Sequence, residues 1–335
     1  MSVAFDTDIR EYLKDWTAKD DRIGALSFFG SYAFFFAVLW ITIEIARTAY
    51  WWAAAPFVVV TAFAGVRLYV LQHDCGHNSL FSRRWMNEWA GYALSPITLT
   101  PFRAMQYNHN MHHAYLGNLE HRETTEIHTM TVTEWNAAGF WQRLGYRLYR
   151  NPLILLPIGG VFTFFIHYRW PKNTLKIGAL GVLVHNALLA GWVYLLYLIF
   201  GWTGPVVLAS VAVVCAVIGV FLVYLQHNFE DAYWDRKPDL DYKQAALQGS
   251  SALDLGHWWD IGTGNIAYHD IHHYNPSIPS YRLRKCHHGL PAEHAPRRVN
   301  WPQAIASFRL KLWDEEAERL VPFPKHAAAT AVPAE

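Results

Sequence analysis

The sequence predicts an all-α integral membrane protein in which a helical cap holds a metal site on one side of the bilayer. The chain of 335 residues is 53% apolar, and only 16% of its residues are charged. Ordinary soluble domains carry roughly 25% charged residues. Several apolar stretches are long enough to cross a bilayer. Three histidine clusters lie beside apolar segments and read HDCGH at 73–77, HNMHH at 109–113 and HDIHH at 269–273.

Charge and cysteine content exclude several classes of function. The net charge is +1 and no long basic run occurs, so we expect no nucleic-acid partner. Three cysteines are too few for a four-thiolate iron–sulfur cluster. Any electrons that the protein uses must therefore come from a separate donor.

Residues 1–26 form an N-terminal segment that precedes the membrane domain. The segment mixes acidic and basic residues with Phe5, Tyr12, Leu13 and Trp16. This pattern favours a short helix on the membrane surface, and a plain solvated helix fits it equally well.

The membrane domain covers residues 27–280. A helix needs about 20 apolar residues to cross the hydrocarbon core. The stretches that reach this length are 27–48, 50–72, 175–200 and 204–226. We expect these stretches to form two hairpins, with four crossings in all.

Two shorter apolar pieces, 91–107 and 152–168, are interrupted by prolines. If all the histidines serve one centre, they must emerge on one side of the bilayer. The first two clusters flank 91–107, so this piece cannot cross. If 152–168 crossed, the later helices 175–200 and 204–226 would deliver the third cluster to the opposite side of the bilayer. We therefore expect 152–168 to lie shallow in the interface or to re-enter.

Basic residues indicate which side this is, because positive charge concentrates in cytoplasmic loops. The flanks on the histidine side carry Arg10, Lys14, Lys19, Arg22, Arg83, Arg84 and Arg103. The opposite turns hold only Arg47 and the uncharged GWTGP at 201–205. We therefore expect both termini and the histidines on the cytoplasmic side.

Residues 281–335 form a polar C-terminal segment on the same side. We expect an amphipathic helix at 301–320 beside the histidines and a disordered tail in the final AAATAVPAE.

The histidine spacing predicts metal ligation. Residues three and four apart share one face of a helix, so each cluster directs its imidazoles towards a common point. The eight side chains are His73, His77, His109, His112, His113, His269, His272 and His273. Because one tetrahedral metal takes only three or four protein ligands, we expect two neighbouring metals. Imidazole suits iron, zinc, copper and nickel alike, so the histidine count names no metal.

The order of the three clusters, with an apolar hairpin between the second and third, resembles the membrane fatty-acid desaturase family. The stretches HDCGHNSLF, NHNMHHAYLGN, YLQHNFED and TGNIAYHDIHHYNPSIPSYRL are most similar to acyl-lipid desaturases of the Δ12/ω-6 kind. The resemblance covers residues 30–290. It implies a non-haem di-iron centre that uses O2 and two electrons to remove two hydrogens from adjacent CH2 groups.

By this resemblance the eight clustered histidines are iron ligands. The family usually has a further histidine near the cytoplasmic end of the last crossing, where this chain has His227. His257 is the competing ninth ligand. Asn265 lies four residues before His269, so on a helix it faces the same side and could reach iron through water, although it could equally cap a helix.

Metal-bound imidazoles also need their second nitrogen held by a hydrogen bond. The acids near the clusters are Asp74, Asp270, Glu230, Asp231, Asp254 and Asp260, and each of them could equally be a solvated side chain near a helix end.

The resemblance implies a long acyl chain that reaches the irons through an apolar tunnel. The acyl group could arrive on a phospholipid, a thioester or a carrier protein, and a separate ferredoxin or cytochrome b5 would supply electrons. A lipid or terpenoid hydroxylase or ketolase on the same scaffold is the alternative enzyme. A non-enzymatic metal carrier is the alternative from another class, and it would need ligands along a path through the bilayer.

Overall fold

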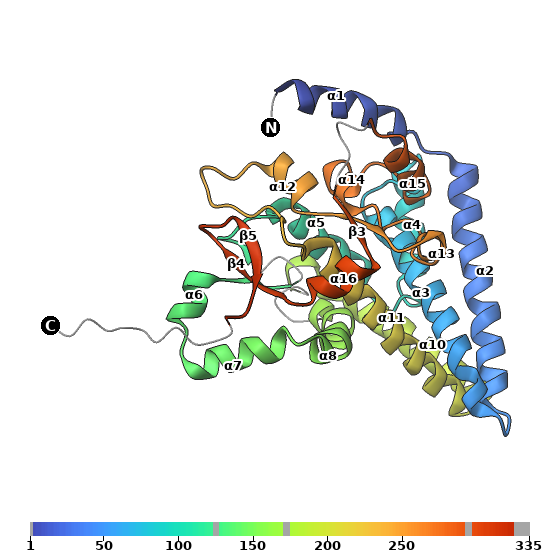
Figure 1. The fold of residues 1–335 in the computed structure, drawn as a ribbon. Helices are drawn as coiled ribbons and strands as arrows, with labels where there is room; N and C mark the ends of the chain where they lie inside the picture. Colours follow the sequence, from blue (N-terminus) through green and yellow to red (C-terminus); the bar gives the residue numbers. More distant parts are fainter. Residues whose placement is uncertain (1–2, 123–126, 170–174, 292–296, 325–335) are drawn as a thin grey trace.

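A computed structural model describes residues 3–122, 127–169, 175–291 and 297–324 of the chain. The four longest described helices are α2 (Asp21–Ala46), α3 (Ala54–Gly76), α10 (Ala179–Phe200) and α11 (Thr203–His227), and each is apolar enough to cross a membrane. They match the four apolar stretches expected from the sequence. In Figure 1 they run together away from most of the shorter elements, which form a cap at one end.

The helix ends follow local capping chemistry rather than the limits of the apolar runs. Helix α2 begins before its apolar run because the side chain of Asp20 accepts hydrogen bonds from the backbone N–H groups of Arg22 and Ile23. Helix α10 begins after Gly178, whose φ of +96° is a conformation that favours glycine.

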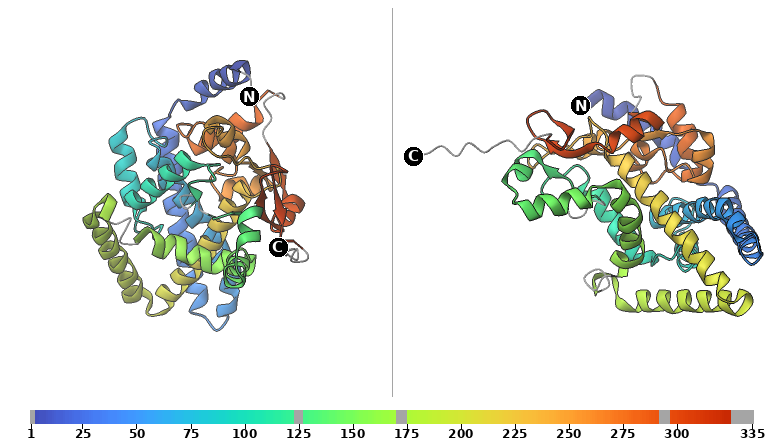
Figure 2. Two further views of the ribbon diagram at one scale, coloured as in Figure 1. Left: turned by 90° about the vertical axis from the view of Figure 1, so that its left-hand side faces the viewer. Right: turned by 60° about the horizontal axis from the view of Figure 1, so that its bottom comes forward.

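Helix α3 lies at the centre of the bundle and packs against both α2 and α11, while α10 packs on α11. Ala62 and Leu68 of α3 are fully buried. Most apolar side chains of α10, such as Leu180 and Leu198, are exposed instead. Figure 2 shows α10 at the outer edge of the bundle, which is where a helix that faces lipid is expected.

The 91–107 region forms two short helices, α4 (Arg84–Leu94) and α5 (Phe102–Tyr115). Their lengths of 11 and 14 residues are each below the roughly 20 residues that a crossing needs. Helix α5 begins directly after Pro101, which serves as its N-cap residue.

The segment Pro152–Arg169, called the 152–169 segment below, is a fifth helix long and apolar enough to cross a membrane. Length and composition alone therefore do not limit the crossings to four. The segment begins with α8 (Pro152–Ile154) and contains two π-helical turns, Leu155–Gly159 and Phe162–Ile166. The first of these turns packs against α11.

The cap is built from short elements. Its helices are α1 (Val3–Lys14), α6 (Val132–Ala137), α7 (Phe140–Tyr149), α12 (Tyr242–Gln248), α13 (His257–Gly262), α14 (His269–Tyr274), α15 (Ser280–His288) and α16 (Trp301–Ser307). Its strands are β1 (Met130–Thr131), β2 (Ala252–Asp254), β3 (Arg298–Asn300), β4 (Leu310–Asp314) and β5 (Arg319–Pro322). They form a three-stranded sheet in the order β1-β4-β5 and the parallel pair β2-β3.

The described chain is mostly helical, as expected, but it also contains these short strands, and they correct the expectation of a helix at 301–320. Helix α16 ends at Ser307, and residues 310–322 form an antiparallel hairpin. Its turn is stabilised by the Asp314 carboxylate, which accepts hydrogen bonds from the backbone N–H groups of Glu316 and Ala317. Strand β4 also pairs with β1, a partner distant in the sequence. The predicted disordered tail lies outside the described residues.

Candidate metal centre

Nine histidines gather where the membrane helices meet the cap. His73 lies near the end of α3, His77 is its C-cap residue, and His227 is the last residue of α11. The other six come from α5 and α14. They form two groups, each of which could hold a metal ion. The first group is His73, His77, His109, His113 and His272, and the second is His112, His227, His269 and His273. Within each group the donor atoms lie within 4.8 Å of one another.

The two groups do not follow the three sequence clusters, which corrects the expectation that each cluster serves one point. His109 and His113 of α5 lie four residues apart and stay together, whereas His112 joins the other group. Helix α14 does the reverse: its i,i+4 pair joins the group of His112, and His272 joins the group of His109 and His113. Successive residues of a helix are about 100° apart, so adjacent histidines must diverge.

Within each group the imidazole Nε2 atoms face one another. In the first group the Nε2–Nε2 distances are 2.8 Å for His73–His109, 2.9 Å for His109–His113 and 3.1 Å for His113–His272. In the second they are 3.1 Å for His112–His273, 2.9 Å for His273–His269 and 3.1 Å for His269–His227. The Nε2 atom of His77 is buried with no hydrogen-bond partner. So many converging nitrogens, one of them unpaired, fit shared metal ions.

Burial keeps these rings neutral. It lowers the pKa of His109, His112 and His113 well below the usual value, and the neighbouring imidazoles lower it further. The pKa values of His269, His272 and His273 are lowered for the same reasons. Neutral imidazole is the form that binds metal, so the donor set is ready for ligation.

The second nitrogen of His227 is held by a backbone carbonyl, whereas that of His73 lies near a carboxylate without forming a hydrogen bond. His227 Nδ1 lies 3.0 Å from the Gly249 carbonyl oxygen, which fixes the ring with Nε2 towards its group. His73 Nδ1 lies 3.5 Å from an oxygen of Asp74. The other oxygen of Asp74 accepts a hydrogen bond from the Ser280 N–H at 2.8 Å, so this acid also ties α3 to α15.

The other acids suggested for this role have different surroundings. Asp270 is buried with an oxygen 3.8 Å from His287 Nδ1, and Asp260 accepts hydrogen bonds from Tyr268 and Arg284. Glu230, Asp231 and Asp254 are exposed, and the first two form ion pairs with Arg319 and Arg297. Of the six acids, Asp74 is the one that approaches a ring of the two groups in the described part of the chain, 3.5 Å from His73 Nδ1.

The structure separates the two candidates for a ninth histidine. His227 lies in the second group. The His257 side chain is 62% exposed, lies 3.7 Å from Asp260 and belongs to neither group.

Asn265 does not share a helix with His269, because α14 begins at His269 and Asn265 has a φ of +64°. The geometric reason for expecting it beside His269 is therefore wrong. Its amide nitrogen donates to the Ser280 carbonyl at 3.0 Å, which leaves the side-chain oxygen as the atom that could accept from a water.

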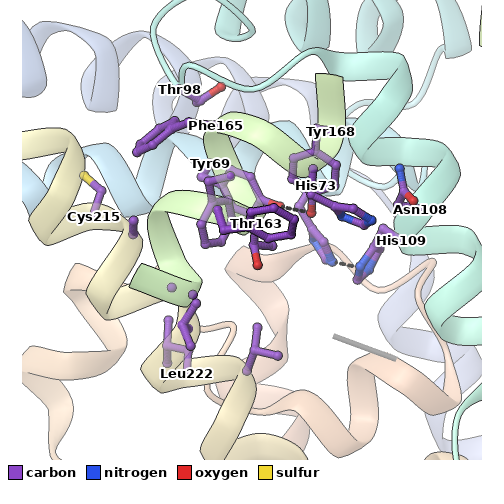
Figure 3. A pocket seen from close by; sticks show the side chains of 18 of the residues that line it. Tyr69, His73, Thr98, Asn108, His109, Thr163, Phe165, Tyr168, Cys215 and Leu222 are labelled. Atoms are coloured by element: carbon purple, nitrogen blue, oxygen red, sulfur yellow. Dashed lines mark hydrogen bonds between the residues drawn. The ribbon is translucent and has the colours of Figure 1, made fainter. Parts of the chain in front are cut away.

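A cavity of about 690 Å³ borders both groups, with His73, His109 and His269 in its wall. Most of its lining comes from α3, α5, α11 and the 152–169 segment. In Figure 3 His73 and His109 lie on one side of the cavity and Cys215 and Leu222 of α11 on the other, with Tyr69 and Thr163 between them. The hydroxyls of Tyr69 and Tyr168 are 3.4 Å apart and join α3 to the 152–169 segment.

One buried cation supports the end of α11 and was not anticipated from the sequence. Arg150 follows α7 and is fully buried. Its guanidinium donates to the side-chain oxygen of Asn228 at 2.6 Å, next to His227, and to the Leu310 carbonyl at 3.2 Å. Nothing in the sequence around Arg150 distinguished it from the other arginines in polar stretches.

Comparison with known proteins places the chain in one family. The model of the family described as "Fatty acid desaturase" matches residues 49–303. The chain is 33% identical to a protein of Bacillus subtilis named "Fatty acid desaturase", over 85% of this chain and 82% of that protein. It is 25% identical to an "sn-1 oleoyl-lipid 12-desaturase" of Arthrospira platensis, over 73% and 69% of the two chains. It is 26% identical to an "sn-1 acyl-lipid omega-3 desaturase (ferredoxin)" of Synechocystis, over 75% and 66%. The chain belongs to the fatty acid desaturase family.

Proposed function

We propose that this desaturase is a di-iron enzyme of the Δ12/ω-6 kind that introduces a double bond into a long acyl chain of a membrane lipid. The observation that supports it most is the pair of histidine groups, both of which border one largely apolar cavity. Two of the relatives described above carry acyl-lipid substrates in their names. The nine histidines would hold the irons, and Asn265 would approach them through water.

The reaction removes two hydrogens from adjacent CH2 groups, and with two electrons and two protons from outside it reduces O2 to two waters. The irons, when bound, supply the oxidising power that an unactivated C–H bond requires. The chain contributes neutral ligands and an enclosing wall. Val66, Val70 and Leu222 line the cavity near Tyr69 and keep water away from the acyl chain.

The electron donor is proposed to be a separate ferredoxin or cytochrome b5. Three cysteines in the whole chain cannot hold a four-thiolate cluster. One relative has ferredoxin in its name, which supports the first of these donors.

The grouping of the histidines supports four crossings. His73 and His227 lie near the ends of α3 and α11, so both helices end at the centre. Because α10 and α11 form a hairpin, α10 begins on that side, where α5 also lies. If the 152–169 segment crossed once between α5 and α10, α10 would begin on the side of the bilayer opposite to the histidines. We propose that the segment enters from the centre's side without crossing, and that this side is cytoplasmic.

The activity is tested by expressing the chain in cells rich in monounsaturated lipids and analysing their fatty acids by gas chromatography. We expect new diunsaturated chains and about two irons per purified chain, one for each histidine group. New hydroxylated or oxidised chains without new double bonds would support the hydroxylase or ketolase instead. A protein that binds no iron would contradict the di-iron centre.

Single histidine variants test the two groups separately. We expect His112→Ala and His272→Ala each to abolish turnover and to lower bound iron, because each removes a ligand from a different group. His257→Ala is the matched control, since this exposed ring lies outside both groups. Iron is measured by mass spectrometry and insertion by membrane fractionation. Substantial activity in either variant would refute the proposed ligand set.

A further inference from the structure

Near their ends at the metal centre, α3 and α11 carry the same three residues. The sequence reads LQH at 71–73 on α3 and again at 225–227 on α11. Both glutamine side chains are buried, with an exposed fraction of 0% for Gln72 and 1% for Gln226. Because a buried amide needs hydrogen-bond partners, the contacts of these two side chains show what each of them holds.

Gln72 joins α3 to the loop that leads into α5. Its side-chain oxygen accepts a hydrogen bond from the Thr98 hydroxyl at 2.8 Å, and its side-chain nitrogen donates to the Thr100 carbonyl at 3.1 Å. Thr100 directly precedes Pro101, the N-cap residue of α5. The loop is therefore fixed to α3 just before the helix that carries His109 begins.

Gln226 makes the equivalent contact from α11. Its side-chain nitrogen donates to the Ile266 carbonyl at 2.8 Å. Ile266 lies shortly before Tyr268, the N-cap residue of α14. The backbone carbonyl of Gln226 also accepts a hydrogen bond from the Ser251 N–H at 2.9 Å. The segment before the second histidine-bearing cap helix is therefore fixed to α11, as the loop before α5 is fixed to α3.

The histidine after each glutamine faces the same cap helix whose start that glutamine holds. His73 Nε2 lies 2.8 Å from His109 Nε2 of α5, and His227 Nε2 lies 3.1 Å from His269 Nε2 of α14. Adjacent side chains of a helix diverge by about 100°, so the glutamine points to the preceding backbone while the histidine points into a metal group. Each membrane helix thus holds one cap helix at two places.

We propose that Gln72 and Gln226 are positioning residues of the metal centre, Gln72 chiefly for the first histidine group and Gln226 chiefly for the second. Helix α5 supplies two ligands to the first group and one to the second, and α14 does the reverse. A shift of either cap helix therefore displaces two ligands of one group and one ligand of the other. This inference rests on the proposed function, because it concerns the irons that the groups would hold.

The test measures iron retained by the purified chain against increasing concentrations of a chelator. Gln72→Met and Gln226→Met keep an unbranched side chain but remove the amide, and each is combined with His272→Ala, which leaves the second group complete, and with His112→Ala, which leaves the first complete. We expect Gln226→Met to weaken iron binding about tenfold in the His272→Ala chain and by less in the His112→Ala chain. Gln72→Met should show the reverse order. A general loss of folding would weaken iron binding equally in both backgrounds.

Hydrogen exchange of the metal-free chain gives a second readout that needs no iron. Gln72→Met should speed the exchange of backbone amides at 97–100, and Gln226→Met should speed that of amides at 263–268, each without affecting the other segment. Gln142→Met on α7 is the matched control, because this glutamine side chain is exposed, and it should change neither segment.

The two measurements separate the possible failures. Equal iron losses in the two histidine backgrounds, or unchanged exchange in both segments, would overturn the inference. If a histidine variant alone bound no iron, the exchange pattern would decide. If the wild-type chain bound no iron, the proposed di-iron function would fail instead, and the exchange pattern would still show whether each glutamine holds its own segment.

Discussion

At the scale of single residues, the divergence of adjacent side chains on a helix explains how two metal ions would share three histidine clusters. Helices α5 and α14 each contribute an i,i+4 pair to one group and the remaining histidine to the other. The two helices are thus linked through both groups. Loss of either helix would disturb both metal positions together.

His227 provides a residue-scale prediction about the ninth ligand. His227→Ala should lower the iron content by up to one of the two irons, because His227 Nε2 lies 3.1 Å from His269 Nε2 in the second group. Iron per chain is compared with that of His257→Ala. Equal iron in the two variants, with full desaturation in His227→Ala, would show that eight histidines suffice.

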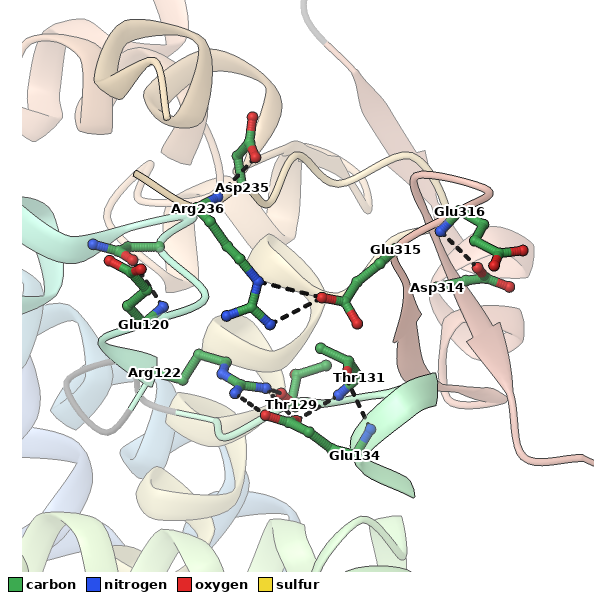
Figure 4. A network of polar contacts seen from close by, with 11 residues as sticks. Glu120, Arg122, Thr129, Thr131, Glu134, Asp235, Arg236, Asp314, Glu315 and Glu316 are labelled. Atoms are coloured by element: carbon green, nitrogen blue, oxygen red, sulfur yellow. Dashed lines mark hydrogen bonds and ion pairs between the residues drawn. The ribbon is translucent and has the colours of Figure 1, made fainter. Parts of the chain in front are cut away.

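At the scale of elements, a short cap helix positions one rim of the cavity. Helix α6 begins with a capping box, in which Thr131 accepts from the Glu134 N–H and Glu134 accepts from the Thr131 N–H. Glu134 also pairs with Arg122, a residue of the cavity lining, and Figure 4 shows this network beside the ion pair of Arg236 and Glu315.

This network gives a stability prediction with a defined pH dependence. Thr131→Ala should lower the free energy of unfolding by about 1 kcal/mol, the usual effect of losing a helix cap. The bond from Arg122 lowers the pKa of Glu134 from 4.5 to about 2. A lowered carboxyl pKa stabilises the fold above the unfolded value of 4.5, and this stabilisation is lost as the pH falls towards 2.

The check is thermal unfolding of the wild type, Thr131→Ala and Glu134→Gln between neutral and acidic pH. The difference between the wild type and Glu134→Gln should shrink as the pH falls below 4.5, whereas the effect of Thr131→Ala on the cap itself persists. A difference that stays constant over this range would mean that the charge of Glu134 contributes nothing to stability.

At the scale of the whole molecule, the membrane hairpins place distant helix ends beside one another. Helices α3 and α11 pack together and both end at the histidines, although about 150 residues separate His73 from His227. The 152–169 segment covers the cavity beside them, and its outward side chains, such as Leu153 and Ile158, are exposed as expected for lipid contact.

The proposed topology predicts where introduced thiols become accessible. Gly139→Cys and Leu175→Cys lie on either side of the 152–169 segment, and both positions are exposed. Both should react with an impermeant thiol reagent from the same face of sealed vesicles, and Ala49→Cys, in the turn between α2 and α3, from the opposite face. Wild-type vesicles give the background of the native thiols. Labelling of Gly139→Cys and Leu175→Cys from opposite faces would mean that the segment crosses.

The sequence by itself determined the membrane class, the four long helices and the set of histidines, because apolar length and residue spacing are local properties. It also favoured His227 over His257, on the basis of family resemblance. Only the tertiary structure decided how the histidines divide into two groups, because this depends on how α5 faces α14. The same holds for the pairing of β4 with β1, the position of Asn265 and the burial of Arg150, because each involves a contact with a residue at least 15 positions away in the chain.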